Sequence, residues 1–208
     1  MTSAPGPVTA DDVTAVVTAA VAALTPAAGS DWTVPAGDLT WDCWETVEHV
    51  ADDLFCYAAQ LGVDGLPDYL PMRAEANREG GVPNTIRADP ASGLDGLLAV
   101  LTAMGALLAA MVRTTPPKVR AHHIFGPADP EASAAMGVLE TLVHTYDVAR
   151  ALGMAWDPDR GVCARVLARL MPTVERTDDA WADLLWATGR IELDGRGRRE
   201  RWRWENSR

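Results

Sequence analysis

Long runs of alanine and leucine, broken at intervals by proline and glycine, constrain the fold of this 208-residue chain more than any other feature. Both residues are strong helix formers, and apolar residues recur at helical spacing within the runs. We therefore predict an all-α fold, an up-and-down four-helix bundle followed by two short helices and a small C-terminal β-ribbon. The predicted long helices span residues 10–25, 41–61, 92–113 and 129–152, and the short ones span 157–170 and 179–188.

The boundaries of the fourth long helix carry the clearest signals. Asp129 suits the N-cap because a carboxylate accepts hydrogen bonds from the free N–H groups of the first turn, and the following proline suits the first helical position. Gly153 suits the position after the last turn, where a left-handed backbone is common. By the same rules we predict that Thr40 caps the second helix, and that Ser92 caps the third together with Asp95.

The end of the chain differs from the rest. Polar and apolar residues alternate there around Asp194-Gly195, a pair typical of tight turns, which predicts a two-stranded ribbon. Residues 189–208 contain seven arginines and four acids, a net charge of +3, so the remaining residues carry a net charge of −14. We therefore divide the chain into a bundle, residues 1–155, and a C-terminal helical extension, residues 156–208, whose basic ribbon packs on the acidic bundle.

The net charge of −11 argues against two classes of partner. Nucleic acids and anionic membranes both attract basic surfaces, so we expect neither. Three scattered cysteines favour a reduced, cytoplasmic compartment, and the N-terminus lacks the pattern of a signal peptide. The most apolar run, residues 97–112, is shorter than a bilayer span and indicates a buried helix. The sequence is compatible with a monomer or a homodimer.

Ligand-type residues form a stripe along the fourth predicted helix. Glu140 and His144 are four positions apart, so their side chains lie one above the other, and Asp147 falls on the same stripe. Two interpretations remain open for this stripe. It is either a solvated face with an acid–histidine pair, or one half of a metal site.

His49 on the second predicted helix supplies the third ligand that a metal site would need. Two histidines and one carboxylate bind divalent metals and leave coordination positions open for water or substrate. On a helical wheel, however, His49 lies nearly opposite the apolar stripe of Val47, Leu54 and Ala58. It must therefore face a cleft to bind a metal, and it is otherwise an exposed residue.

Other candidate groups are explained more simply by structural roles. The sequence contains no GxSxG, no P-loop and no GxGxxG that opens a helix. Cys43 is expected to be a packed thiol, and His122 and His123 are expected in a structural loop near the mouth of the site. Four tryptophans are expected in the core rather than around a cofactor: Trp41, Trp44, Trp181 and Trp186.

Taken together, three segments resemble a known family, the DinB-like, mycothiol-dependent maleylpyruvate isomerase N-terminal family. The first, from residue 31, reads DWTVPAGDLTWDCWETVEHVADDL and matches a Trp-rich entry followed by a helix with one histidine. The second, from residue 122, reads HHIFGPADPEASAAMGVLETLVHTYDVARALG and matches an E-x-x-x-H-T-x-D helix. The third, from residue 184, reads LLWATGRIELDGRGR. The resemblance spans most of the chain.

This resemblance implies a DinB-like bundle that holds a divalent metal through His49, Glu140 and His144. Zinc is the first expectation, and nickel, iron or manganese accept the same ligands. Asp147 matches the family's acid after the histidine, where it would orient a ligand imidazole. Relatives use mycothiol or a similar low-molecular-weight thiol as co-substrate, and a metal lowers the pKa of a bound thiol so that it adds to a small electrophile. The implied activity is that of a thiol-dependent isomerase or S-transferase.

The chain departs from the family's named enzyme in its length. That isomerase has a separate C-terminal α/β domain that contributes to its site, whereas only two short helices and a tail follow the four long helices here. The resemblance therefore points to the metal site more firmly than to maleylpyruvate as substrate. Arg190 is a candidate for holding a substrate carboxylate. Two alternatives stay open: a non-catalytic bundle that binds a metal or a small molecule, and a thiol-independent metal hydrolase.

Overall fold

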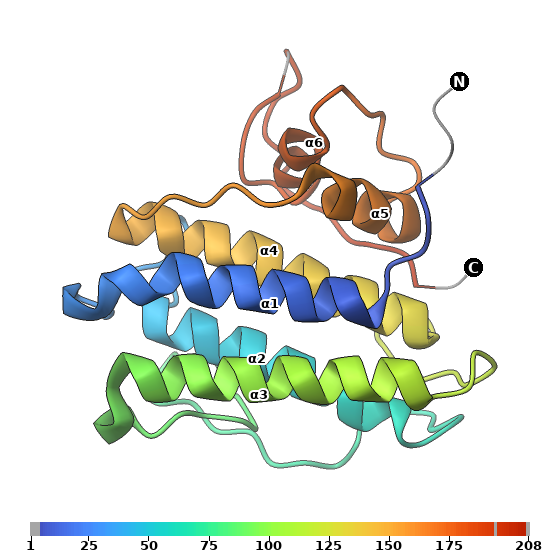
Figure 1. Cartoon of the computed structure of the whole chain (residues 1–208), viewed down its shortest axis with the longest axis horizontal. Helices are drawn as coiled ribbons and strands as arrows, with labels where there is room; N and C mark the ends of the chain where they lie inside the picture. Colours follow the sequence, from blue (N-terminus) through green and yellow to red (C-terminus); the bar gives the residue numbers. More distant parts are fainter. Residues whose placement is uncertain (1–4, 194, 207–208) are drawn as a thin grey trace.

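The computed structural model describes residues 5–193 and 195–206 and confirms the all-α fold class. The described residues form six α-helices and two short 3-10 helices (Figure 1). The elements are α1 (Ala10–Leu24), η1 (Thr25–Gly29), α2 (Cys43–Leu61), η2 (Pro90–Ser92), α3 (Gly93–Thr114), α4 (Pro130–Leu152), α5 (Arg160–Leu170) and α6 (Ala180–Ala187).

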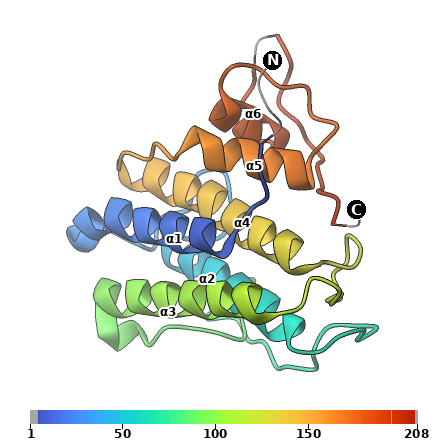
Figure 2. The same ribbon diagram turned by 45° about the vertical axis from the view of Figure 1, so that its right-hand side comes forward.

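The four long helices lie side by side, with α1 and α2 each packed between α3 and α4 (Figures 1 and 2). Their directions differ from the alternation that we expected. An ion pair joins Asp11 at the start of α1 to Arg113 at the end of α3, so these two helices are antiparallel. By contrast, α2 and α3 run in the same direction, because residues 62–89 return along the length of both helices (Figure 1). The prediction of a simple up-and-down order was therefore wrong.

Helix starts follow the capping rules, with two shifts from the prediction. Asp129 caps α4 through a 2.7 Å hydrogen bond from the N–H of Ala132. The cap of α2 is Asp42 rather than Thr40, because Asp42 and Glu45 form a reciprocal capping box that a threonine two residues earlier cannot match. Ser92 precedes α3 but makes no capping hydrogen bond, since its hydroxyl donates to the carbonyl of Asp89 instead.

The long link between α2 and α3 is held down by acidic residues of α2. Glu48 and Asp52 are almost fully buried on the side of α2 that faces the link. Asp52 accepts hydrogen bonds from the backbone N–H groups of Thr85 and Ile86, at 2.9 and 2.7 Å. Glu48 accepts from the N–H of Ala88 at 2.9 Å and from the side chain of Asn77. These carboxylates accept hydrogen bonds from backbone N–H groups of the link, which would otherwise need water as their partner.

The C-terminal segment does not form the ribbon that we predicted. Among the described residues there is no strand, and the two sides of the expected turn share only an isolated bridge between Leu193 and Arg196. The alternating side chains contact α6 and the loop before α4 instead of each other across a hairpin. Arg196 stacks on the ring of Trp186 of α6, and Trp204 is buried against Phe125. This segment therefore lies along α6, which packs on α5, and α5 packs on α4.

Two helical segments are long and apolar enough to cross a membrane by composition alone. They are Ala10–Gly29 and Pro90–Thr114. Helices in the core of a soluble protein pass the same test, so it is weak support for a membrane location. Both segments pack against other long helices on part of their surface, and the cytoplasmic location remains a prediction from sequence.

Close approach of helices depends on glycine at two positions in the core. A Cβ atom on Gly137 of α4 would lie 2.5 Å from a methyl carbon of Leu108 and 2.9 Å from one of Leu54. A Cβ on Gly105 of α3 would lie 2.8 Å from Val17 of α1. Both distances are shorter than real contacts between carbon atoms, so these glycines set the spacing of the helices.

Replacement of Gly137 by alanine is expected to lower the free energy of unfolding by up to about 2 kcal/mol. Overpacking costs roughly 1–3 kcal/mol, and the gain of about 1 kcal/mol that alanine brings to a helix offsets part of this cost. Urea denaturation measures the change. Ala103→Gly on the exposed side of α3 is the control for the helix term alone and is expected to cost about 1 kcal/mol. A Gly137→Ala variant more stable than the parent would contradict the packing argument.

Candidate metal site

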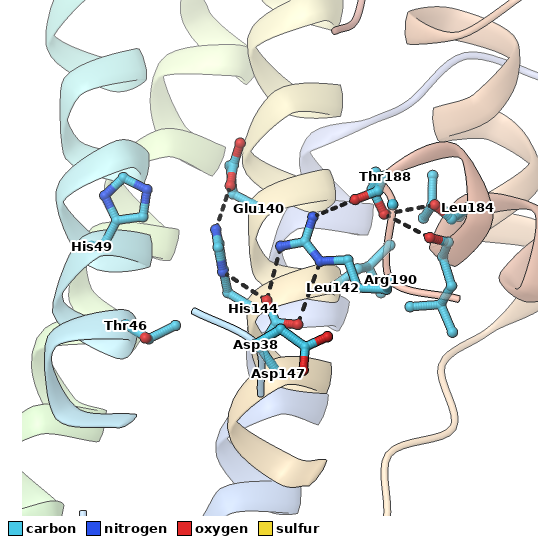
Figure 3. Close-up of polar contacts among 12 residues, drawn as sticks. Asp38, Thr46, His49, Glu140, Leu142, His144, Asp147, Leu184, Thr188 and Arg190 are labelled. Carbon is cyan, nitrogen blue, oxygen red and sulfur yellow. Dashed lines mark hydrogen bonds and ion pairs between the residues drawn. The ribbon is translucent and has the colours of Figure 1, made fainter. Parts of the chain in front are cut away.

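His49, Glu140 and His144 meet between α2 and α4. Each offers one ligand atom, and these atoms all lie within 4.8 Å of one another. Glu140 and His144 stand one turn apart on α4, with 3.1 Å between Glu140 Oε2 and His144 Nε2. His49 projects from α2 toward this pair (Figure 3). The structure thus brings together the three residues that the sequence proposed.

The direction of His49 is explained by how α2 packs. The helix turns its apolar stripe, which includes Val47 and Leu54, into the core. Its opposite side is not solvent, because α4 and the loop before α2 lie there. The Trp41 ring of that loop meets the His49 imidazole edge to face, with 4.7 Å between ring centroids. His49 therefore keeps 21 % of its side chain exposed and faces a cleft.

Asp147 and Arg190 extend the site behind His144. Asp147 Oδ2 lies 3.1 Å from His144 Nδ1 and accepts a 2.8 Å hydrogen bond from the guanidinium of Arg190 (Figure 3). Arg190 follows α6 and also donates to the carbonyl of Thr188 at 3.0 Å. An acceptor at Nδ1 fixes the imidazole so that Nε2 faces Glu140 and His49, the arrangement found behind histidine ligands of metals. Asp147 thus occupies the orienting position that the sequence suggested.

Burial and charge act in opposite directions on the histidines. For His144, burial lowers the pKa, but hydrogen bonds with Asp147 and Glu140 outweigh it and raise the pKa to about 9. For His49, burial and the charge of His144 lower the pKa to about 4. Burial raises the pKa values of Glu140 and Asp147, and their bonds with His144 reverse the shift and hold both below the usual value. In the metal-free protein both ring nitrogens of His144 are therefore protonated at neutral pH, and each faces a carboxylate.

Sequence analysis missed Asp53, which stands one turn after His49 on α2. Its Oδ2 lies 3.3 Å from His49 Nε2. Burial, with the nearby charge of Glu140, raises the pKa of Asp53 well above the usual value. The signal was available, because His49 and Asp53 repeat the four-residue spacing of Glu140 and His144. Antiparallel helices set the two acid–histidine pairs face to face.

A cleft of about 740 Å³ opens beside the three candidate ligands. Its walls come from α2, α4, the loop before α2 and the C-terminal segment. Arginines and acids alternate around it, and Arg198 pairs with Asp38 at 2.6 Å. The lining residues are Asp38, Leu39, Trp41, His49, Glu140, His144, Asp147, Thr188, Gly189, Arg190, Glu192, Arg198, Arg199, Glu200 and Trp202.

Other residues singled out in the sequence have mixed outcomes. Cys43 is fully buried, as expected of a packed thiol. Trp181 is buried in the core, whereas Trp41, also expected there, lines the cleft. His122 and His123 lie in the loop before α4 but do not line the cleft. Arg190 lines the cleft, and its nearest charged partner is Asp147.

In metal-free protein, Asp147→Asn is expected to lower the free energy of unfolding by about 2–4 kcal/mol at pH 6, because it removes one partner of a buried charge. His144 has a folded pKa of about 9, above its ordinary 6.5. Its stabilisation is therefore complete below pH 6.5 and is lost as the pH rises through about 9. The loss of unfolding free energy caused by Asp147→Asn should therefore be smaller at pH 10 than at pH 6.

Urea denaturation of both proteins after chelator treatment, at pH 6 and at pH 10, measures this difference. Asp38→Asn provides a control on an acid that is 45 % exposed, and its effect should be small at both pH values. An equal cost for Asp147→Asn at the two pH values would contradict the assignment of a proton to His144.

Comparison of the chain with family models, with curated proteins and with solved structures finds no match. The geometry of the site therefore rests on the structure alone. The likeness to the DinB-like family remains a prediction from the three sequence segments.

Proposed function

We propose that the protein is a metal-dependent enzyme of the thiol-using isomerase or S-transferase type. The observation that carries the proposal is the meeting of His49, Glu140 and His144 at the wall of a 740 Å³ cleft. Metal ligands that line an open cleft suit catalysis better than a purely structural site, which is usually closed by a fourth protein ligand. The DinB-like arrangement of the four helices and the low-molecular-weight thiol belong to the same proposal.

The residues present fit a divalent metal. Ligand atoms about 2.0–2.2 Å from a tetrahedral zinc lie roughly 3.3–3.6 Å apart. Glu140 Oε2 and His144 Nε2 are 3.1 Å apart, and His49 lies within 4.8 Å of both. The carboxylate of Asp147 behind His144 is the partner that a ligating histidine requires. Zinc is the first candidate, with nickel, iron or manganese as further possibilities for the same set.

Such a metal would lower the pKa of a bound thiol and so supply a nucleophile at neutral pH. The residues of the chain would position the ligands and line the cleft. Glu140 and His144 hold their geometry through buried hydrogen bonds, and Trp41 shields His49 from solvent. The cleft offers alternating arginines and acids, which suit a polar co-substrate such as mycothiol, a small thiol rich in hydroxyl groups.

Asp53 favours a second candidate, a metal hydrolase that needs no thiol. A carboxylate 3.3 Å from a candidate ligand is placed where a general base is needed. A bundle that binds a metal without catalysis is the remaining alternative, and the basic C-terminal segment does not distinguish it from the other two.

Metal content is the first test. Protein purified without an affinity tag is expected to carry about one equivalent of divalent metal, measured by elemental analysis. His144→Ala removes a ligand and should reduce this content several-fold. His122→Ala is the matched control, because His122 lies outside the three-residue group. A parent protein with far less than one equivalent, unchanged by His144→Ala, would contradict the metal site.

Arg190→Gln tests whether this arginine acts through Asp147. Loss of a partner behind a metal ligand typically reduces affinity by about 10–100-fold, and we expect that range in competition with a coloured chelator. Arg198→Gln removes a neighbouring arginine of the cleft that pairs with Asp38 instead, so it should leave the affinity unchanged. Equal affinities for both variants would indicate that Arg190 serves only the substrate, as the sequence suggested.

Conjugation assays with mycothiol and a panel of small electrophiles separate the candidate functions. We expect turnover that requires the thiol and that is lost in His49→Ala. Turnover without any thiol would instead indicate the hydrolase. Metal-loaded protein with no turnover under either condition would favour the non-catalytic bundle.

A further inference from the structure

A second cavity lies on the other side of the three candidate ligands. It has a volume of about 200 Å³, and we call it the small chamber. Seven residues line it: Asp53, Cys56, Tyr57, Gln60, Tyr69, His122 and His123. The first four belong to α2, and the others come from the link after α2 and from the loop before α4. No residue of the small chamber lines the larger cleft.

The small chamber and the cleft occupy opposite sides of His49 along α2. The cleft is lined by Trp41, which precedes the helix, whereas Tyr57 of the small chamber stands two turns after His49. At about 1.5 Å per residue, two turns correspond to roughly 12 Å along the axis. Asp53 lines the small chamber and contacts His49, 3.3 Å away, so it separates the small chamber from the candidate ligands.

Hydrogen bonds between chain segments hold the small chamber in shape. The Gln60 side chain accepts from the N–H of Leu70 at 3.1 Å and donates to the carbonyl of Asp68 at 2.9 Å. The hydroxyl of Tyr69 accepts from the N–H of Ile124 at 3.0 Å. The link after α2 is thus bonded to α2, and the loop before α4 is bonded to the link, as expected of a preformed pocket.

The small chamber is lined by uncharged hydrogen-bond donors. His123 Nδ1 accepts from the N–H of Phe125 at 3.1 Å, so the neutral imidazole carries its hydrogen on Nε2. Burial supports this state by lowering the pKa of His123 to about 4. The Tyr57 hydroxyl makes no hydrogen bond with a residue that the structure describes, although only 8 % of the residue is exposed. Tyr57 lines the small chamber, so its hydroxyl is available to donate a hydrogen bond to a molecule there.

We propose that the small chamber binds a small, uncharged molecule with a carbonyl group, which accepts hydrogen bonds from Tyr57 and His123. Its 200 Å³ corresponds to about seven times the 30 Å³ share of one water molecule in the liquid. The Asp53 carboxyl group disfavours an anion there, and the two donors disfavour a cation. This site goes beyond the proposed function, because Asp53 and His49 separate it from the cleft that would receive the thiol.

Titration of metal-free, ¹⁵N-labelled protein with three probes of one size tests the proposal. Propionamide is uncharged, propionate is an anion and propylammonium is a cation. We expect propionamide alone to shift the imidazole nitrogens of His123, with saturation. The proposal is overturned if propionamide causes no shift, or if propionate or propylammonium binds as tightly.

Two variants locate the bound probe. Cys56→Phe fills the small chamber and should weaken propionamide at least tenfold, while Val63→Phe, a change at an exposed residue just beyond α2, should leave it unchanged. Tyr57→Phe removes one donor with little change of shape and should weaken propionamide severalfold even if Cys56→Phe fails to fold. Unchanged binding in Tyr57→Phe and in a folded Cys56→Phe would overturn the proposal.

These measurements need neither metal nor turnover, so they can fail separately from the proposed function. Probe binding without any turnover would support the small chamber and contradict the enzyme. Turnover without any probe binding would overturn the small chamber and leave the enzyme in place.

Discussion

The contact between Asp147 and Arg190 is the interaction on which the candidate site depends. Asp147 is buried between two cations, protonated His144 and Arg190, which together offset the cost of removing its charge from water. Arg190 does not come from the four long helices. It follows α6, which reaches the site because α5 packs on α4 and α6 packs on α5. The C-terminal extension is therefore part of the site and not an appendage to a self-sufficient bundle.

Helix α2 explains why so many acids are buried in this protein. One side of it presents His49 and Asp53 to α4, and another presents Glu48 and Asp52 to the long link. Each buried carboxylate has a specific partner, either an imidazole or backbone N–H groups, and such pairing is the condition under which burial is tolerated. The helix is thus an element with two polar interfaces and a narrow apolar stripe, which is why its helical wheel was difficult to interpret.

Much of the fold and of the site could be predicted from local patterns. Capping residues and helical spacing located the helices, and the same spacing paired Glu140 with His144. His49 and Asp53 show the same four-residue spacing. The direction of α3 could not be predicted from local sequence patterns, because it depends on the path of the long link. The expected ribbon failed because the alternating side chains pack elsewhere: Arg196 packs against α6, and Trp204 packs against the loop before α4.

The position of Arg190 also has a consequence for the order of events during synthesis. All three candidate ligands precede residue 150 in the chain, whereas Arg190, the arginine that pairs with Asp147, is synthesised about forty residues after Asp147. Until Arg190 emerges, a nascent chain carries the ligands without this contact. A metal that reaches the chain early would meet a less rigid site, which the C-terminal segment would then stabilise.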